Sequence, residues 1–241
     1  MNKLILENLA NEFRTKVLQI NLFEPVSIHK ALRITGILCS FRPLDDDISG
    51  MAIKIQHDGD NQAHCFMLIN TNDRYCKQRF TACHEFYHLL YQKKFSKSVD
   101  DTNYSSKEVE ERSANIFASF LLLPEAGLKM LAPVEEQRKD RITLGTILKL
   151  EQHFRCSRTT LLLRLKEIGW GSEEYLSKYS ENVKRSAADY GYNTSLYEPT
   201  KITEVYGDYN VKARSLFDRG LISRSKYMAL IDDMGLNKEV K

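Results

Sequence analysis

Apolar residues recur at helical spacing in the first part of the chain. The recurrence runs through a segment without glycine or proline and predicts an amphipathic first helix. Its members are Leu4, Ile5, Leu9, Phe13, Val17 and Ile20. After Pro25, Ser27 can cap a second, short helix, and Gly36 is a residue at which that helix can end.

The pattern then changes to the alternation typical of strands. Residues 37–41 predict one strand, 48–55 a second and 63–69 a third. The sequence Asp-Gly-Asp-Asn at 58–61 has strong turn chemistry and predicts a hairpin between the last two strands. We therefore expect a small sheet of about three strands.

Two longer helices follow the predicted sheet. Helical spacing resumes over 74–94, and after a polar stretch at 96–106 a further helix begins near Ser105 or Ser106 and ends at Pro124. Glu108 lies three residues after Ser105, as in a capping box.

The first of these helices contains the motif His-Glu-x-x-His. His84 and His88 are four residues apart, so their imidazoles project from one face of the helix and can bind one metal ion. Glu85 is placed to act as general base on a zinc-bound water. The pattern alone also arises by chance, with two surface histidines and no metal.

The second helix supplies a third ligand. A catalytic zinc ion usually has three protein ligands and an open position for water, and two histidines with a glutamate form a common set. Glu111 is the best candidate, Glu108 on nearly the same face is the alternative, and Asn115 is expected to support Glu111. We interpret Glu108 and Glu110 as a solvated acidic first turn, and the histidines that flank the 58–61 turn, His57 and His64, as solvated rather than ligating.

The second half of the chain is predicted to be helical. Residues 144–169 predict two helices around a short turn, with Ser157 capping the second, and resemble a helix-turn-helix. Arg158 and Arg164 could contact DNA or a partner, or the unit could serve packing or substrate docking. Residues 171–201 are polar and predict an irregular linker, and 203–236 predict a small helical pair.

Composition limits the class of protein. The 241 residues are 42% hydrophobic and 28% charged, which is typical of a soluble globular protein, and neither a membrane span nor a signal peptide is expected. We therefore expect a cytoplasmic protein. Five scattered cysteines predict no disulfide framework and are expected to be small core residues, and a net charge of +3 is too small to indicate nucleic-acid binding by the whole chain.

Two blocks of sequence, taken in order, resemble a known family. Gln-Arg-Phe-Thr-Ala-Cys-His-Glu-Phe-Tyr-His occupies 78–88, and Glu-Arg-Ser-Ala-Asn-Ile-Phe-Ala-Ser-Phe-Leu-Leu-Leu-Pro occupies 111–124. Together they resemble the ImmA/IrrE family of zinc metallopeptidases, over about residues 25–170. Members often have glycine where this chain has Tyr87 and glutamate where it has Ser113, and Tyr87 could narrow the cleft.

The resemblance implies a fold, a site and a function. It implies an α+β fold with a zincin-like metallopeptidase core at 1–140, followed by the helix-turn-helix-like region at 141–170 and a linker with a C-terminal helical region at 171–241. It places zinc on His84, His88 and Glu111, with Glu85 as the catalytic residue. It also implies a protein substrate, a helix-turn-helix transcriptional repressor whose cleavage derepresses genes.

Two points of mechanism and one rival function stay open from the sequence. Tyr87, Tyr91 and Tyr104 are candidate donors to the oxyanion, and the strand at 48–55 could hold an extended substrate by strand addition. The rival is a DNA-binding or antitoxin-like regulator with a structural or vestigial zinc site. The intact Glu85 favours catalysis, since a purely structural site does not need it.

Overall fold

The computed structural model describes residues 2–45, 48–56, 63–92 and 104–234, with the side chains of 104–107 left undescribed. Helix α1 (Lys3–Glu12) continues into a π-helical segment, Phe13–Val17, and α2 spans Ile28–Thr35. The Ser27 hydroxyl accepts a hydrogen bond from the main-chain N–H of Lys30, and Gly36 adopts a left-handed φ of 67°. Both predicted ends of α2 are therefore confirmed.

The sheet has four strands in the order β2-β3-β1-β4. They are β1 (Leu38–Arg42), β2 (Gly50–Ile55), β3 (His64–Asn70) and β4 (Glu204–Tyr206). The predicted hairpin of β2 and β3 is confirmed by their antiparallel pairing, although its turn lies outside the described residues. β1 pairs in parallel with β3, so β2 forms one edge of the sheet.

The expectation of about three strands omitted β4, which lies where a helical segment was predicted. β4 pairs antiparallel with β1, with Val205 opposite Ser40. The preceding segment is fixed beside β3, because the main-chain N–H of Lys201 donates to the carbonyl of Thr71 and the Thr71 hydroxyl donates to the carbonyl of Ile202. Three residues are too few for a strand pattern, and the open edge of β1 decides their conformation.

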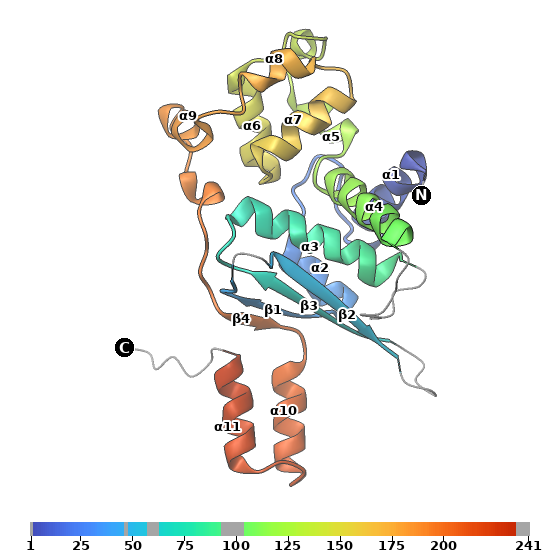
Figure 1. The fold of residues 1–241 in the computed structure, drawn as a ribbon, viewed down its shortest axis with the longest axis vertical. Helices are drawn as coiled ribbons and strands as arrows, with labels where there is room; N and C mark the ends of the chain where they lie inside the picture. Colours follow the sequence, from blue (N-terminus) through green and yellow to red (C-terminus); the bar gives the residue numbers. More distant parts are fainter. Residues whose placement is uncertain (1, 46–47, 57–62, 93–103, 235–241) are drawn as a thin grey trace.

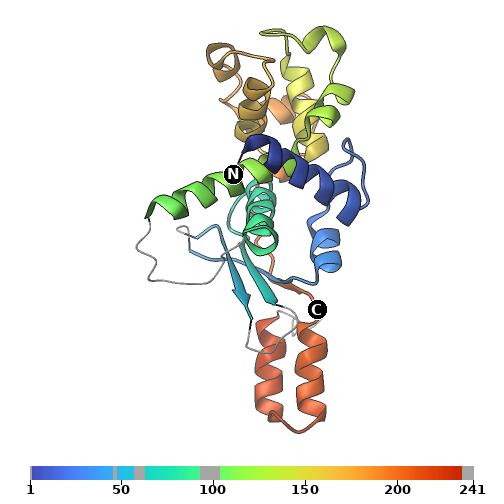
Figure 2. The ribbon, with the colours of Figure 1, turned by 90° about the vertical axis from the view of Figure 1, so that its right-hand side faces the viewer.

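One face of the sheet packs against helices. Helix α3 (Tyr75–Leu90) crosses this face, and α4 (Tyr104–Leu122) packs on α3 together with α1 (Figures 1 and 2). The side chains that β1 and β3 direct into this core include Cys39, Met67 and Ile69, all fully buried. The metal motif therefore lies on a helix that is held between the sheet and a second helical layer.

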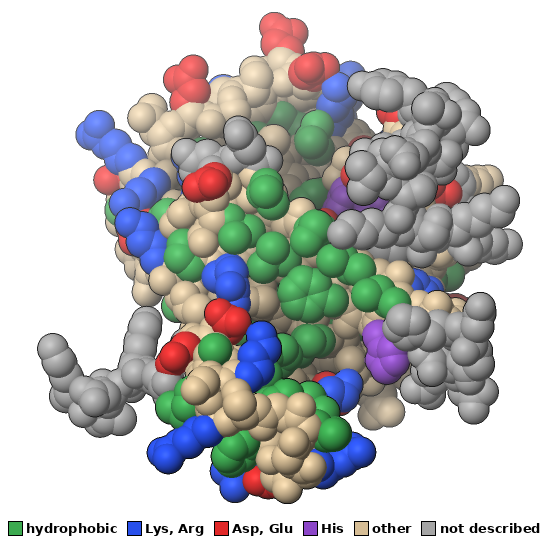
Figure 3. Space-filling view, turned by 60° about the horizontal axis from the view of Figure 1, so that its bottom comes forward, with side chains coloured by type: hydrophobic (Ala, Val, Ile, Leu, Met, Phe, Trp, Pro, Cys, Tyr) green, Lys and Arg blue, Asp and Glu red, His purple; other side chains and the backbone are tan. Residues whose placement is uncertain are grey.

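The opposite face of the sheet carries apolar side chains at its surface. The strand register puts Met51, Ile53, Phe66 and Leu68 on this face, and Met51 is 39% exposed. Figure 3 shows hydrophobic side chains gathered over this part of the molecule.

A second group of helices lies above α3 in Figure 1. It contains α5 (Glu125–Leu131), a 3-10 turn at Val134–Glu136, α6 (Leu144–Phe154), α7 (Arg158–Glu167), α8 (Glu173–Ser177), α9 (Val183–Asp189) and a 3-10 turn at Thr194–Tyr197. The two helices predicted within 144–169 and the Ser157 cap are confirmed. The segment 171–201, expected to be irregular, instead contains α8 and α9.

After β4 the described chain forms a pair of helices, as the sequence predicted for 203–236 except at the residues of β4. α10 (Tyr209–Asp218) and α11 (Arg224–Asp233) pack against each other and project beyond the sheet (Figure 1). One contact that ties the pair to the sheet is the hydrogen bond from Arg42 Nη2 to the carbonyl of Asp233, at 2.8 Å.

By length and composition the stretch Glu108–Leu131 could cross a membrane, but 56% of its apolar window is buried inside the protein, as in a core helix. The five cysteines are unpaired, and four of them are buried, as expected for small core residues.

Candidate metal centre

Helices α3 and α4 bring the predicted ligands together. In α3 the apolar residues Cys83 and Tyr87 are fully buried and fix the rotation of the helix, so His84 and His88 face α4 at the edge of the core. Glu111 lies in the first half of α4, which packs along α3. The candidate ligand atoms of His84, His88 and Glu111 all lie within 4.8 Å of one another.

The distances between these atoms suit one tetrahedral ion. The two Nε2 atoms are 3.0 Å apart, His84 Nε2 is 3.1 Å from Glu111 Oε2, and His88 Nε2 is 3.6 Å from Glu111 Oε1. Bonds of about 2.0–2.1 Å to a tetrahedral zinc ion would put neighbouring donors about 3.3 Å apart. The three observed separations lie on both sides of this value, so the donor set fits a zinc ion.

Two amide side chains orient the histidines. The Nδ1 atom of His84 is 3.0 Å from Asn115 Oδ1, and the Nδ1 atom of His88 is 2.5 Å from Gln92 Oε1. Because a carbonyl oxygen only accepts, each Nδ1 carries the proton, and each Nε2 lone pair points toward Glu111. The ligands are thus held in the tautomer that binds metal.

These contacts correct one expectation and add a residue. Asn115 was expected to support Glu111, but it contacts His84, which lies opposite it on α3. Gln92 was not predicted, although it follows His88 by four residues and helical spacing would have placed the two side chains together.

The two glutamates at the site differ in their environment. Glu111 is about half exposed, and the imidazoles of His84 and His88 beside it hold the pKa of its carboxyl well below the usual range, so it is ionised. Glu85 is only 8% exposed, and burial raises the pKa of its carboxyl against the opposing effect of the two histidines. Within the described part of the chain, no hydrogen bond or ion pair engages the Glu85 carboxylate.

The neighbouring glutamates are not ligands. Glu108, the alternative third ligand, lies at the surface 3.6 Å from Arg112. Glu110 was expected to be solvated, but its Oε2 accepts a hydrogen bond of 2.7 Å from the hydroxyl of Tyr87. The reason is the rotation of α3, which places the Tyr87 ring beside that of His88, with 5.7 Å between the centroids, and brings its hydroxyl within reach of Glu110 on α4.

The structure also places two of the three tyrosines that were candidate donors to the oxyanion. Tyr87 is fully buried against Phe117, so it neither narrows a cleft nor donates to an oxyanion, contrary to expectation. Tyr91 packs its ring against Phe13 and Phe117, on the α1 side of the helix. Burial raises its pKa to about 12. The side chain of Tyr104 lies outside the described residues.

The predicted DNA-contacting or partner-contacting arginines are buried. Arg158 is 2% exposed, and its Nε lies 2.7 Å from Glu151 Oε2. Arg164 is 4% exposed and packs over the ring of Phe120, and its Nε donates to the carbonyl of Leu123. Both guanidinium groups are enclosed in the helical layer and are not available to DNA, so of the roles left open by the sequence the packing role fits these two residues.

Of the two histidines that flank the 58–61 turn, the structure describes only His64, which is not part of this cluster. His64 is exposed on β3, and His57 falls outside the described residues.

The fold and the site define a class. A small sheet crossed by a helix with two histidine ligands, and a second helix that supplies a glutamate, form a zincin-like metallopeptidase core. Residues 40–166 match the peptidase family described as the IrrE N-terminal-like domain, and the chain belongs to this family. No curated protein matches the chain. Membership indicates a metallopeptidase, and the cluster of His84, His88 and Glu111 could bind its metal.

Proposed function

We propose that this protein is a zinc-dependent endopeptidase that cleaves a helix-turn-helix transcriptional repressor in the cytoplasm and so derepresses the genes that the repressor controls. The observation that carries the proposal is the convergence of two oriented imidazoles and an ionised carboxylate on one point, with Glu85 buried beside it. Two nitrogen donors and one oxygen donor suit zinc better than calcium or magnesium.

The chain supplies a proton carrier next to the ion. A zinc ion held here would lower the pKa of a coordinated water and polarise the scissile carbonyl. Glu85 takes the proton and passes it to the leaving amine. Burial raises the pKa of its carboxyl, which favours its acceptance of a proton, and none of the described residues forms a hydrogen bond or ion pair with the carboxylate.

Strand β2 is proposed to hold the substrate. It is an edge strand, and the Lys54 ammonium donates to the carbonyl of Leu89, the residue after His88. The main-chain N–H of Asn70 donates to the carbonyl of Ser49, so these two residues form a hydrogen-bonded pair. The main-chain N–H and C=O groups of residues 49, 51, 53 and 55 therefore point toward β3. The main-chain groups of Lys54 therefore face the free edge, where an extended peptide could add.

The catalytic part is tested with Glu85→Gln. The variant should keep zinc and its folding transition but lose cleavage of a co-expressed helix-turn-helix repressor, taken first from a neighbouring gene. Glu108→Gln is the matched control, because it neutralises an exposed glutamate on α4 that is not a ligand, and it should cleave normally. Cleavage that persists in Glu85→Gln would exclude the mechanism.

The substrate-binding part is tested by comparing Lys54→Pro with Lys54→Ala. Both variants lose the contact with Leu89, and only proline also removes the main-chain N–H at the free edge. We expect Lys54→Pro to cleave more slowly than Lys54→Ala with equal zinc content. Equal rates would argue against strand addition at β2.

A further inference from the structure

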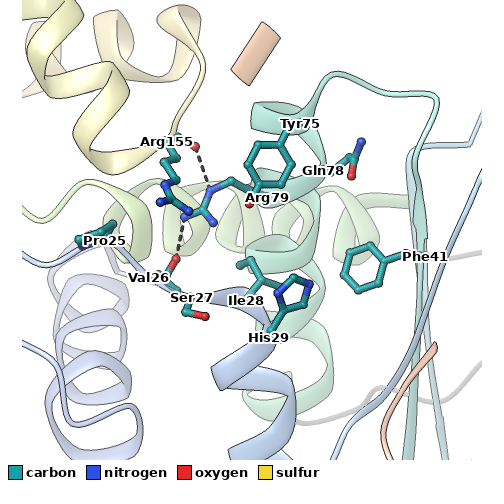
Figure 4. Close-up of a pocket in the computed structure, with 10 residues that line it drawn as sticks. All are labelled: Pro25, Val26, Ser27, Ile28, His29, Phe41, Tyr75, Gln78, Arg79 and Arg155. Carbon is teal, nitrogen blue, oxygen red and sulfur yellow. Dashed lines mark hydrogen bonds between the residues drawn. The ribbon is translucent and has the colours of Figure 1, made fainter. Parts of the chain in front are cut away.

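A pocket of about 240 Å³ lies at the other end of α3 from the metal. Its walls come from the loop before α2, the first turn of α2, β1, the start of α3, and the turn between α6 and α7 (Figure 4). None of its lining residues is a metal ligand or Glu85.

Arg79 brings a buried positive charge to this pocket. It is 3% exposed, its Nε donates to the carbonyl of Arg155 at 3.0 Å, and its Nη2 donates to the carbonyl of Val26 at 2.7 Å. In the described part of the chain no carboxylate lies within 4.0 Å of it, and its Nη1 has no acceptor. A buried guanidinium is normally paired with a negative group.

Arg14 is another buried arginine whose hydrogen bonds go to main-chain carbonyls, and it offers a comparison, although Arg79 also packs over the Tyr75 ring, 5.8 Å from its centroid. Arg14 donates to four main-chain carbonyls, those of Asn21, Leu22, Glu24 and Leu121. Arg79 has two such partners, and the rest of its guanidinium faces the pocket. Arg14 does not line the pocket, although its Nε is buried without a hydrogen-bond partner, whereas the part of the Arg79 guanidinium that the main chain does not engage borders the pocket.

Arg155 adds a second guanidinium to the same pocket. Its side chain forms no ion pair with a described carboxylate, and in Figure 4 it lies on the same side of the pocket as Arg79. Its main chain has a φ of 54°, at the end of α6, where glycine would be unstrained. The chain thus places an arginine, rather than the favoured glycine, beside a charge that it should repel.

The remaining walls suit an organic ligand. Phe41, Tyr75 and Ile28 give the pocket an apolar side, and the His29 ring is held by stacking on Tyr206 at 4.3 Å between centroids. The first turn of α2 adds main-chain N–H groups that have no partner within the helix.

We infer that this pocket binds a small organic anion, with a carboxylate or phosphate group between Arg79 and Arg155 and an apolar or aromatic body against Phe41 and Tyr75. The anion would supply the negative charge that both guanidinium groups lack. The volume suits a compact molecule, because it lies below the roughly 300–1,000 Å³ of pockets for drug-sized ligands.

The test uses the full-length, zinc-loaded protein and three probes that share one aromatic ring. Phenyl phosphate and benzoate carry the two candidate charged groups, and benzyl alcohol carries none. Binding is measured by isothermal titration calorimetry and by the shift in melting temperature. The tighter of the two anions identifies the charged group.

The variants are Arg155→Gly and Lys201→Gly. Each removes one positive charge at a residue with a left-handed main chain, with φ of 54° and 51°, and each replacement relieves that conformation. Arg155 lines the pocket, whereas Lys201 does not. Arg155→Gly should therefore fold normally and bind the anion roughly tenfold or more weakly, while Lys201→Gly should bind like the original protein.

Three results would overturn the inference. They are the absence of binding by either anion at millimolar concentration, equal binding by Arg155→Gly and the original protein, and binding of benzyl alcohol as tight as that of the anions.

Discussion

Replacing Asn115 by alanine separates the affinity for zinc from the stability of the fold. Asn115 fixes His84 through one hydrogen bond of 3.0 Å between Oδ1 and Nδ1, and its side chain is otherwise exposed. Without it the His84 ring can rotate and change tautomer, so part of the binding free energy is lost in orienting the ring.

The expected loss of zinc affinity depends on the exposure of this hydrogen bond to solvent. Loss of a partner that orients a metal ligand typically weakens metal binding about 10–100-fold. A neutral hydrogen bond contributes about 1 kcal/mol net, or about fivefold, and water can replace the exposed Asn115 amide. We expect the zinc dissociation constant of Asn115→Ala to rise about 5–10-fold. The stability of the zinc-free protein should rise by up to about 0.7 kcal/mol, because alanine is the better helix former.

The assay is competition for zinc against a chromogenic chelator, combined with urea unfolding of the zinc-free protein. Gln92→Ala should have the larger effect, because its contact with His88 is shorter and partly buried. Arg112→Ala is the control, since Arg112 lies on the same helix and, among the described residues, pairs with the exposed Glu108. The reasoning is refuted if Asn115→Ala binds zinc within twofold of the original protein, or if Arg112→Ala loses as much affinity.

Three further predictions concern Tyr87 and His88 on α3 and Gly127 on α5. Tyr87→Phe should lower the free energy of unfolding by about 1 kcal/mol and leave cleavage unchanged, because the hydroxyl donates its hydrogen bond to Glu110. Normal stability with much slower cleavage would instead indicate that the Tyr87 hydroxyl acts in catalysis. Zinc affinity should fall as the pH decreases, starting above about 6.5. Burial disfavours the charged form of His88, but the hydrogen bonds with Glu111 and Gln92 outweigh this effect and raise its pKa, so protons compete with zinc for this ligand. A chelator titration in which affinity is lost only well below pH 6 would contradict this. Gly127→Ala should destabilise by about 1–3 kcal/mol in urea, because the added Cβ would lie 2.3 Å from the carbonyl oxygen of Leu22; unchanged unfolding would show that the helix can shift.

The two histidines of the candidate metal site were predictable because they depend on local spacing. Two histidines four residues apart must share a helix face, and Glu111 in the next helix completes a common ligand set. Gln92 follows the same rule and could have been predicted. The contact of Asn115 with His84 could not have been predicted, because this contact depends on how α4 is rotated against α3.

The burial of two arginines in the helical layer could not be predicted from the sequence. Arg158 and Arg164 look like the basic residues of a recognition helix, and only their packing against Glu151 and Phe120 shows that they are internal. In the same way the three residues of β4 form a strand because β1 has an open edge for them, not because of a propensity of their own.

The sequence by itself predicted the elements with a strong period, the end signals of α2 and α7, and the candidate ligands His84, His88 and Glu111 with Glu85, and it left Glu108 as the alternative to Glu111. The tertiary structure decided which side chains from different elements meet. It pairs Tyr87 with Glu110, encloses the arginines of α7 and adds β4 to the sheet. It also leaves Arg79 at a pocket with no negative partner among the residues that the structure describes. The physical reason is that periodicity records which residues share a face of one element, whereas contacts between elements depend on the packing of the whole chain.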